Sequence, residues 1–332
     1  MTQGKFIFNT ICLLVLVLLL TAADLCFGSI SLFSLSPDDP LFSNILYDFR
    51  LPKTLTCILA GSALSICGLL MQSLFRNPLA GPYVLGVSSG ASLFVAVATM
   101  LLTSLNISGV FFVGKGIITL FSIAGAFFVT LIILMVSKKS KSNVTILLVG
   151  LMLSQILGAS QGLIEYISSP DSLKTFVMWS MGSVGGTTLS DLRFVAPLTL
   201  ILLGLGFCLI KPMNAILLNE QYAQNLGVNI HRLRISVIVI TSILVGLITA
   251  FCGPIAFVGI SVPIASRLFF KTSHHLHQMV FCILIGAIVM LTADIICQGI
   301  SNQFTLPINT VTTLIGSPIV IYLLFRSKLN IG

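Results

Sequence analysis

The chain has 332 residues, of which 56% are hydrophobic and only 8% are charged, and its formal net charge is +8. Because water-soluble domains carry about 25% charged residues, this composition excludes an ordinary soluble domain and predicts an integral membrane protein. The basic residues are scattered between apolar runs rather than clustered, so they indicate membrane topology and argue against a nucleic-acid partner.

Ten apolar runs come near the ~20 residues that a helix needs to cross a bilayer. They predict an all-α fold, a single transmembrane domain over 1–332, and spans at 6–27, 53–74, 83–104, 115–137, 144–167, 190–210, 234–252, 255–270, 279–298 and 306–325. The first run is long for the apolar core of a signal peptide and lacks a clear cleavage site, so an uncleaved span is expected. The eighth opens with Gly253-Pro254, which predicts an irregular upper end.

The number and charge of the spans also predict their orientation. An even number of spans places both termini on one side of the membrane. If that side is the cytoplasm, 12 of the 17 Lys and Arg residues lie in inner loops and the remaining 5 lie outside. The positive-inside rule therefore predicts cytoplasmic termini.

The second span begins in the stretch 50–92, RLPKTLTCILAGSALSICGLLMQSLFRNPLAGPYVLGVSSGAS. Arg50 and Lys53 come directly before or at its start, where basic side chains can anchor a helix at the membrane interface. The small residues that follow permit close helix packing. The break at 76–82 must be buried in protein or line water, because lipid cannot bond free backbone groups.

Two later connections between spans are short and distinctive. Between spans four and five, Ser142, Asn143 and Val144 indicate a tight polar loop. Between spans five and six, the only tryptophan, Trp179, is followed by Gly182 in a glycine-rich segment. This pattern predicts a short interfacial helix with a flexible end.

The loop at 211–234 stands out among the connections between spans, and it is cytoplasmic in this topology. Glu220 is the only acid on that side. Glu220 and Ala223 are spaced to share one face of a short helix, and Gly227 is placed to cap its C-terminus. Taken alone, this pattern indicates a capped surface helix.

Two polar residues inside spans are candidates for function, Gln72 and Asp294. An acid within a span costs roughly 2.5–3.5 kcal/mol on insertion scales. Asp294 is therefore expected either to bond a neighbouring helix near the outer end of span nine or to carry protons in a secondary transporter. Gln72 is expected to be one of the scattered polar groups of a mainly apolar pathway, which suits a large chelated cargo better than a bare ion.

No segment predicts catalysis or a resident cofactor. GVFFVGKG at 109–116 lacks the Ser/Thr of a phosphate-binding loop. GVSSG at 86–90 matches a nucleophile elbow, but it opens a membrane helix, so helix packing is preferred over a serine hydrolase built on Ser88. His274, His275 and His277 have no nearby Cys, which favours a polar loop over a metal site. The chain is thus expected not to be an enzyme and to bind no metal.

RLPKTL, GLLMQ and FRNPLAGPYVLGVSSGAS, in this order, resemble the signature of a family of permease subunits. These FecCD-like permeases belong to ATP-driven importers for iron–siderophore, haem and cobalamin complexes, and the resemblance covers about 47–324. It implies an ABC type II importer permease in the cytoplasmic (inner) membrane, with a ferric siderophore or haem favoured over cobalamin as cargo. The implied partners are a second permease copy (the same or a related chain), a cytoplasmic ATPase dimer that binds ATP and magnesium, and an extracytoplasmic substrate-binding protein.

The resemblance also implies roles for particular residues. Arg50 and Lys53 would dock acidic residues of the binding protein from a solvated rim. The pattern E-x-x-A-x-x-x-G, formed by Glu220, Ala223 and Gly227, would engage the ATPase. The implied gate residues are Ser142, Asn143 and Val144 on the inner side, with Trp179 and Gly182 near the outer mouth.

The chain departs from the family pattern at four positions. Lys53 stands where Arg is usual, and Gln298 stands where a basic residue is common. Both changes predict a thinner basic docking rim. A thinner rim leaves the resemblance intact but makes the cargo unsafe to assign by analogy. Ile264 also stands where a His is common, and Asn309 stands where a Gly is usual.

Overall fold

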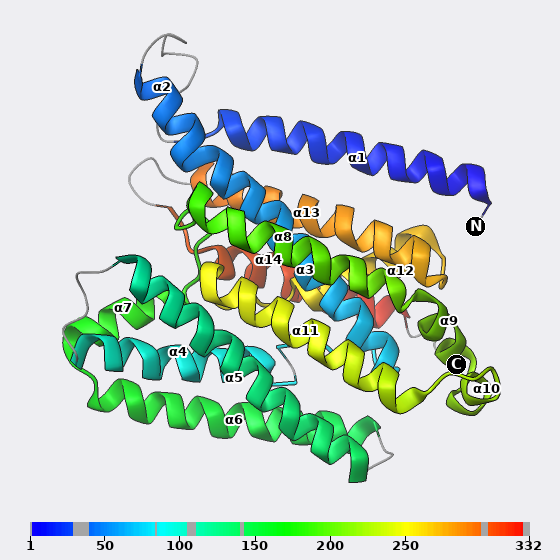
Figure 1. The fold of residues 1–332 in the computed structure, drawn as a ribbon. Helices are drawn as coiled ribbons and strands as arrows, with labels where there is room; N and C mark the ends of the chain where they lie inside the picture. Colours follow the sequence, from blue (N-terminus) through cyan, green and yellow to red (C-terminus); the bar gives the residue numbers. More distant parts are fainter. Residues whose placement is uncertain are drawn as a thin grey trace. The chain divides into compact units, whose positions relative to one another are not determined.

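A computed structural model describes residues 2–28, 40–83, 85–104, 111–139, 143–299 and 305–327. These residues form helices joined by short turns (Figure 1). The helices are α1 (Gln3–Cys26), α2 (Pro40–Asn44), α3 (Leu51–Phe75), α4 (Val87–Ser104), α5 (Phe111–Lys139), α6 (Asn143–Ile167), α7 (Pro170–Ser180), α8 (Leu189–Cys208), α9 (Ile210–Leu218), α10 (Glu220–Asn225), α11 (Ile230–Cys252), α12 (Val258–Phe270), α13 (His275–Gly299) and α14 (Ile308–Ser327).

The all-α membrane fold predicted from the sequence is confirmed. Within the described ranges, seven helical segments are long and apolar enough to cross a membrane, namely Gln3–Cys26, Pro40–Phe75, Gly116–Ser137, Thr145–Ile167, Leu189–Cys208, Ile230–Cys252 and His275–Gly299. Three shorter apolar helices are Val87–Leu102, Val258–Phe270 and Ile308–Tyr322. Each of the ten apolar runs coincides with one of these helices. The exact number of spans and the side of the termini stay predictions.

The boundaries of two helices can be compared with the spans expected from the sequence. The chain leaves α11 at Cys252 and is not helical again until Val258, so the irregular start of the eighth run is confirmed. The second run starts earlier than expected, because α2 and a π-helical segment, Ile45–Arg50, lead directly into α3. The π-helical segment ends two residues before Pro52, whose nitrogen cannot donate a hydrogen bond.

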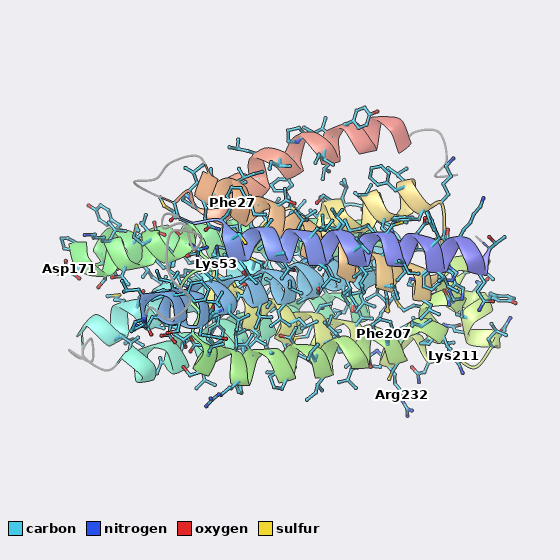
Figure 2. All side chains as sticks on the ribbon, turned by 90° about the horizontal axis from the view of Figure 1, so that it is seen from above. Phe27, Lys53, Asp171, Phe207, Lys211 and Arg232 are labelled. Carbon is cyan, nitrogen blue, oxygen red and sulfur yellow. The ribbon has the colours of Figure 1, made fainter. Side chains whose placement is uncertain are left out.

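The residues group into two compact units. The first unit consists of Met1–Leu69, Ser183–Phe207 and Ile255–Gly332, and the second consists of Leu70–Gly182 and Cys208–Pro254. Within the first unit, Phe27 and Lys53 lie at one end and Phe207 lies at the other (Figure 2). Within the second, Asp171 lies at the opposite end from Lys211 and Arg232. The single transmembrane domain inferred from the sequence stays a prediction.

Small residues bring the helices of the first unit together. A Cβ atom on Gly61 of α3 would collide with the backbone of Gly286 in α13, and one on Gly68 would collide with the backbone of Gly259 in α12. The Ser62 hydroxyl donates to the Ile283 carbonyl at 3.2 Å, across the same contact between α3 and α13. Such close approach is how membrane helices associate without a hydrophobic driving force. The part of α3 that belongs to the first unit therefore packs closely against α13 at Gly61 and against α12 at Gly68.

The second unit uses small and hydroxyl residues in the same way. Gly90 of α4 lies against the backbone of Gly125 in α5. The Ser122 hydroxyl of α5 donates to the Gly246 carbonyl of α11 at 2.9 Å, and a hydroxyl pair on the same two helices, Thr130 and Ser242, is also hydrogen-bonded. Polar side chains inside this unit thus bond across helices, as intramembrane hydroxyls are expected to do.

Candidate functional site

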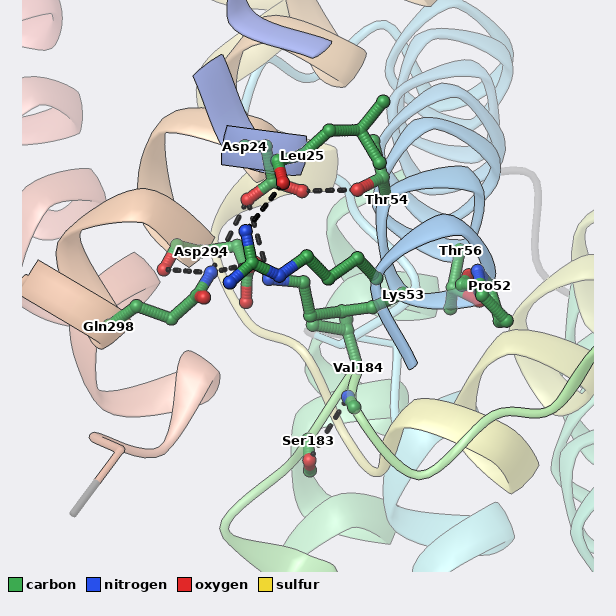
Figure 3. A network of polar contacts seen from close by, with 12 residues as sticks. Asp24, Leu25, Pro52, Lys53, Thr54, Thr56, Ser183, Val184, Asp294 and Gln298 are labelled. Carbon is green, nitrogen blue, oxygen red and sulfur yellow. Dashed lines mark hydrogen bonds and ion pairs between the residues drawn. The ribbon is translucent and has the colours of Figure 1, made fainter. Parts of the chain in front are cut away.

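Five polar side chains meet at one end of the first unit, and we call them the Lys53 cluster: Asp24, Lys53, Thr54, Asp294 and Gln298. Asp24 lies in the last turn of α1, and Lys53 and Thr54 lie in the first turn of α3. Asp294 and Gln298 lie four residues apart near the end of α13, so their side chains share one face. Three helix ends from distant parts of the sequence therefore converge here (Figure 3).

The cluster is organised around the ammonium group of Lys53. Its Nζ lies 2.8 Å from Oδ2 of Asp294 and 3.5 Å from Oδ1 of Asp24. The Thr54 hydroxyl donates to Oδ2 of Asp24 at 2.5 Å. The Gln298 amide nitrogen donates to Oδ2 of Asp294 at 2.6 Å and to Oδ1 of Asp24 at 3.3 Å. Each carboxylate therefore receives a cation and at least one neutral hydrogen-bond donor.

Burial makes these contacts important. The Lys53 side chain is only 12% exposed, Asp24 is fully buried and Asp294 is nearly so. Removing charges from water costs several kcal/mol for each ion, which is offset only when the charges are paired and hydrogen-bonded. The ion pairs and the donors of Thr54 and Gln298 meet this requirement. The cluster therefore joins α1, α3 and α13 and is not a set of solvated surface charges.

Arg50 also points inward. Its Nη1 donates to the carbonyls of Leu25 at 2.6 Å and Cys26 at 2.9 Å. The last carbonyls of a helix lack partners within the helix, and a cation is favourable at that end of the helix dipole. A Cβ atom on Gly28 would lie 2.7 Å from Nη2 of Arg50, so a glycine leaves the room that this guanidinium occupies.

These contacts correct one expectation. The sequence placed Arg50 and Lys53 on a solvated basic rim, because charged residues before a membrane span usually reach water. The structure contradicts this exposure, since Arg50 is buried and Lys53 is nearly so. The reason is that Asp24 and the end of α1 supply partners that the local sequence does not reveal. That the two residues dock a binding protein stays a prediction.

A cavity of about 120 Å³ adjoins the cluster. Lys53, Asp294 and Gln298 belong both to the cluster and to the lining of the cavity. The remaining lining residues are Ser183, Val184, Gly185, Cys297, Thr305, Leu306 and Ile308. Figure 3 shows Ser183 and Val184 on the side of Lys53 that faces away from Asp24. All of these residues belong to the first unit.

The structure gives Asp294 a helix-to-helix contact. The sequence left open whether this acid bonds a neighbouring helix or carries protons. Its ion pair with Lys53 and its hydrogen bond from Gln298 are sufficient reasons for an acid at this depth. The expected bond to a neighbouring helix is therefore confirmed, and proton transport by Asp294 stays the alternative hypothesis. The other intramembrane candidate, Gln72, is buried within the protein.

In the second unit, the loop at 211–234 contains the predicted short helix. Asn219 caps the start of α10, and its side-chain oxygen accepts a hydrogen bond from the backbone nitrogen of Gln221 at 3.3 Å. Gly227 has φ +83°, and its nitrogen bonds the Gln224 carbonyl at 2.9 Å. The Val228 nitrogen bonds the Ala223 carbonyl at 2.9 Å. These two bonds form a Schellman motif, so the glycine cap is confirmed.

One face of α10 is held by the protein and the other is open. Ala223 is fully buried, and Oε1 of Glu220 accepts a hydrogen bond from Nη2 of Arg234 at 2.9 Å. Leu218, Tyr222 and Leu226 are exposed around the helix. A short, capped helix that presents apolar side chains is suited to contact with another protein.

The neighbouring α9 is held by a second arginine. Nη2 of Arg76, just after the end of α3, donates to the carbonyl of Ile216 in α9 at 2.5 Å. Both residues belong to the second unit. The loop is thus fixed at two points, by Arg76 at α9 and by Arg234 at α10. A rigid attachment of this kind can transmit a rigid-body movement of a bound partner.

The predicted gate residues fall into two groups. The expected short helix near Trp179 is α7, and the indole nitrogen of Trp179 donates to the Ala250 carbonyl of α11 at 3.3 Å. Gly182 has φ +77°, and a Cβ atom on Gly253 would lie 2.9 Å from its Cα. Trp179 and Gly182 thus pack on the end of α11. Ser142 lies outside the described residues, as do the side chains of Asn143 and Val144 at the start of α6.

Sequence reasoning missed several partners. Asp24 is the most important, although the same insertion cost that singled out Asp294 applies to any acid in an apolar run. No local sequence pattern indicated that Arg234 pairs with Glu220. None indicated that Thr54 donates a hydrogen bond to Asp24. Among the described residues, no three or more His, Cys, Asp or Glu side chains are grouped so that they could hold a metal ion.

Comparison with known proteins identifies the family. The model of the FecCD transport family matches residues 9–326. The hemin transport system permease protein HmuU of Yersinia pestis is 31% identical over 335 residues, covering 98% of this chain and 97% of that protein. The vitamin B12 import system permease protein BtuC of Escherichia coli O127:H6 is 34% identical over 325 residues, covering 96% and 94%.

Solved structures agree with this result. An inward-facing structure of an ABC transporter assigned to the metal-chelate type superposes with a TM-score of 0.84 at 29% identity, covering 96% of this chain and 99% of the other. PsaBC from Streptococcus pneumoniae, in complex with Fab, shares the fold with a TM-score of 0.55 at 15% identity. The chain is therefore a multi-pass membrane permease of the ABC transporter class. It belongs to the FecCD transport family.

Proposed function

We propose that this chain is the permease subunit of an ATP-driven importer that moves a ferric siderophore or a haem-type iron complex across the cytoplasmic membrane. The observation that carries the proposal is the similarity to haem and vitamin B12 permeases over nearly the full length of both proteins. Both named cargoes are large chelates in which a macrocycle holds the metal. Cobalamin is the alternative cargo, and iron complexes are preferred because they are the commoner substrates of the family.

The proposed architecture follows the resemblance. The chain forms one transmembrane domain with ten spans and cytoplasmic termini, and it pairs with a second permease copy to enclose the pathway. A twofold pair is the commonest arrangement among soluble homo-oligomers. The residues expected to gate the pathway are Ser142, Asn143 and Val144 on the inner side and Trp179 and Gly182 on the outer side.

The proposed ATPase contact is α10. Its exposed apolar side chains, its glycine cap and its attachment through Glu220 and Arg234 support this assignment. ATP and magnesium bind to the separate ATPase dimer, and the permease chain carries no catalytic residue. Movement of the ATPase subunits shifts α10 as a rigid body, and the second unit receives that movement through Ala223 and Arg234.

The proposed outer contact lies at the start of α3. A substrate-binding protein docks near Arg50 and Lys53 and delivers the cargo. Lys53 lines a cavity near the end of α13 and Arg50 bonds the end of α1, which supports a contact there. Their inward orientation indicates that the contact differs from a simple basic rim.

Uptake in cells that lack and then regain this chain tests the proposal. Labelled ferric siderophores, haem and cobalamin are offered with and without vanadate, which inhibits ABC ATPases. We expect uptake of one iron complex to be lost in the deletion, restored by the chain and blocked by vanadate. Restored uptake of cobalamin alone would select the alternative cargo. Uptake that ignores vanadate and collapses with an uncoupler would contradict the proposal.

A further inference from the structure

We propose that Asp24 and Asp294 are internal competitors for Lys53, which set how strongly this permease docks an acidic partner. The two carboxylates hold the ammonium inward, so a carboxylate of a binding protein must reach into the adjoining cavity to share it. The inference rests on the proposed docking at the start of α3. According to this inference, the binding protein contacts a recessed and largely neutralised cation at that place and not an open basic rim.

The ammonium group of Lys53 is already ion-paired within the chain. Among the described residues, both Asp294, at 2.8 Å, and Asp24, at 3.5 Å, are within ion-pair distance of its Nζ. The two carboxylates offset the charge of the ammonium, so these three residues carry no net positive charge. A partner carboxylate approaching from a distance therefore meets no local excess of positive charge from Lys53. Long-range attraction, which raises association rates between complementary surfaces, is correspondingly reduced.

Lys53 is still accessible over a short range. Lys53 and Asp294 line the 120 Å³ cavity, which has room for about four water molecules if each occupies its share of liquid volume. That space suits the head of one carboxylate side chain. An ammonium has three N–H donors, and its long flexible stem can turn without backbone movement. Lys53 can thus turn toward the cavity when its internal partners are weakened.

Arg50 cannot take the place of Lys53 as the cation that turns toward the cavity. Its guanidinium is buried and donates to the Leu25 and Cys26 carbonyls at the end of α1. Turning it outward would leave those carbonyls without this donor. By contrast, Asp24 and Asp294 keep the donors of Thr54 and Gln298 when Lys53 turns. Lys53 is therefore the cation whose position the carboxylates control.

The test measures how accessible the Lys53 amine is, without any binding protein. The chain is reconstituted in lipid vesicles and treated with a membrane-impermeant sulfonated N-hydroxysuccinimide ester, and the modification rate at each lysine is followed by mass spectrometry. Lys174, an exposed residue of α7, is the internal reference. We expect Lys53 to react about tenfold or more slowly than Lys174, because charge-assisted hydrogen bonds hold its ammonium.

Variants then identify the competitors. Asp294→Asn and Asp24→Asn are expected to raise the Lys53 rate severalfold, with Asp294→Asn the larger effect because its carboxylate is closer. Asp171→Asn, which removes an exposed carboxylate from α7, is the matched control and should leave the rate unchanged. Wild-type Lys53 reacting as fast as Lys174 would overturn the inference even if no variant folds. Equal Lys53 rates in all folded variants would overturn it too.

This outcome is separable from the docking proposal. If the labelling pattern is found but Lys53→Gln leaves cargo uptake unchanged, the competition exists and the docking role of Lys53 fails. If uptake depends on Lys53 but its labelling rate equals that of Lys174, docking stands and the internal competition fails.

Discussion

Two ion pairs in this protein have similar geometry and very different surroundings. Lys53 and Asp294 lie 2.8 Å apart with side chains only 12% and 6% exposed. Arg234 and Glu220 lie 2.9 Å apart with side chains 16% and 35% exposed, so this pair is only partly buried and its carboxylate reaches water. A buried pair is costly to break, because the remaining charge is left in a poor solvent. An exposed pair contributes little, because water and salt replace the lost partner. Distance alone therefore says little about what each pair does.

The largest effect is expected when the cation of the buried pair is removed. Lys53→Met keeps the apolar stem but leaves Asp24 and Asp294 without their ammonium group. Breaking a buried pair in this way costs about 3–5 kcal/mol. Thermal and denaturant unfolding of the detergent-solubilised protein should show the loss.

The control for this variant is Lys174→Met on α7, where the side chain is exposed. Substitutions at such positions usually change stability by less than about 0.5 kcal/mol. If Lys53→Met is as stable as Lys174→Met, the cluster is not a buried ion-pair network, and the contrast between the two regions disappears.

A smaller loss is expected when the buried pair keeps its charges and loses one neutral donor. Thr54→Val preserves shape but removes the hydroxyl that donates to Asp24 at 2.5 Å. Hydrogen bonds to charged groups contribute about 1.5–3 kcal/mol. The free energy of unfolding should fall by that amount relative to Thr175→Val, whose exposed hydroxyl bonds a carbonyl of its own helix. Equal midpoints for the two variants would show that Asp24 does not depend on Thr54.

In the exposed region, the backbone should matter more than the ion pair. Gly227 has φ +83°, and no atom lies within 4 Å of the place of an added Cβ, so Gly227→Ala tests conformation alone. The left-handed conformation costs a residue with a side chain roughly 1–2 kcal/mol. Gly158→Ala, which is also in open space but within helix α6, should be neutral or stabilising.

The transport activities of Gly227→Ala and Gly158→Ala should also differ. The strain at position 227 disturbs the Schellman motif that ends α10, so vanadate-sensitive uptake and co-purification of the ATPase should both fall. Unchanged uptake with Gly227→Ala would mean that the cap does not shape the ATPase contact.

The smallest effect is expected at the exposed pair itself. Because the Glu220 carboxylate reaches water, Glu220→Gln should reduce the free energy of unfolding by about 0.2–1 kcal/mol, the range found for exposed pairs. The difference should shrink in 1 M salt, where the Debye length falls to about 3 Å, close to the 2.9 Å between the two groups. The Lys53→Met deficit should persist under the same conditions, because buried pairs are screened much less. A salt-resistant deficit at Glu220 would place this pair in the same class as the buried one.

The candidate site was only partly predictable, and the residues show why. Gly227 and Ala223 were placed correctly because a helix cap depends on a few consecutive residues. Asp294 was flagged by the cost of an acid in lipid, but its partner could not be identified. Lys53 and Arg50 were expected at the surface, since nothing in residues 45–60 reveals that the end of α1 lies beside them.

The sequence alone determined the class of this protein, its helices and its family. Apolar runs that match the bilayer thickness specify membrane helices wherever they occur, and the segment at 50–92 carries the family signature. Only the tertiary structure decided which charged side chains are buried and which partners they have. Asp24 meets Thr54 across 30 positions and Gln298 across 274. Such contacts depend on how glycine crossings such as Gly61 with Gly286 bring the helices together. Burial then decides which charges are held inside the protein and which face water.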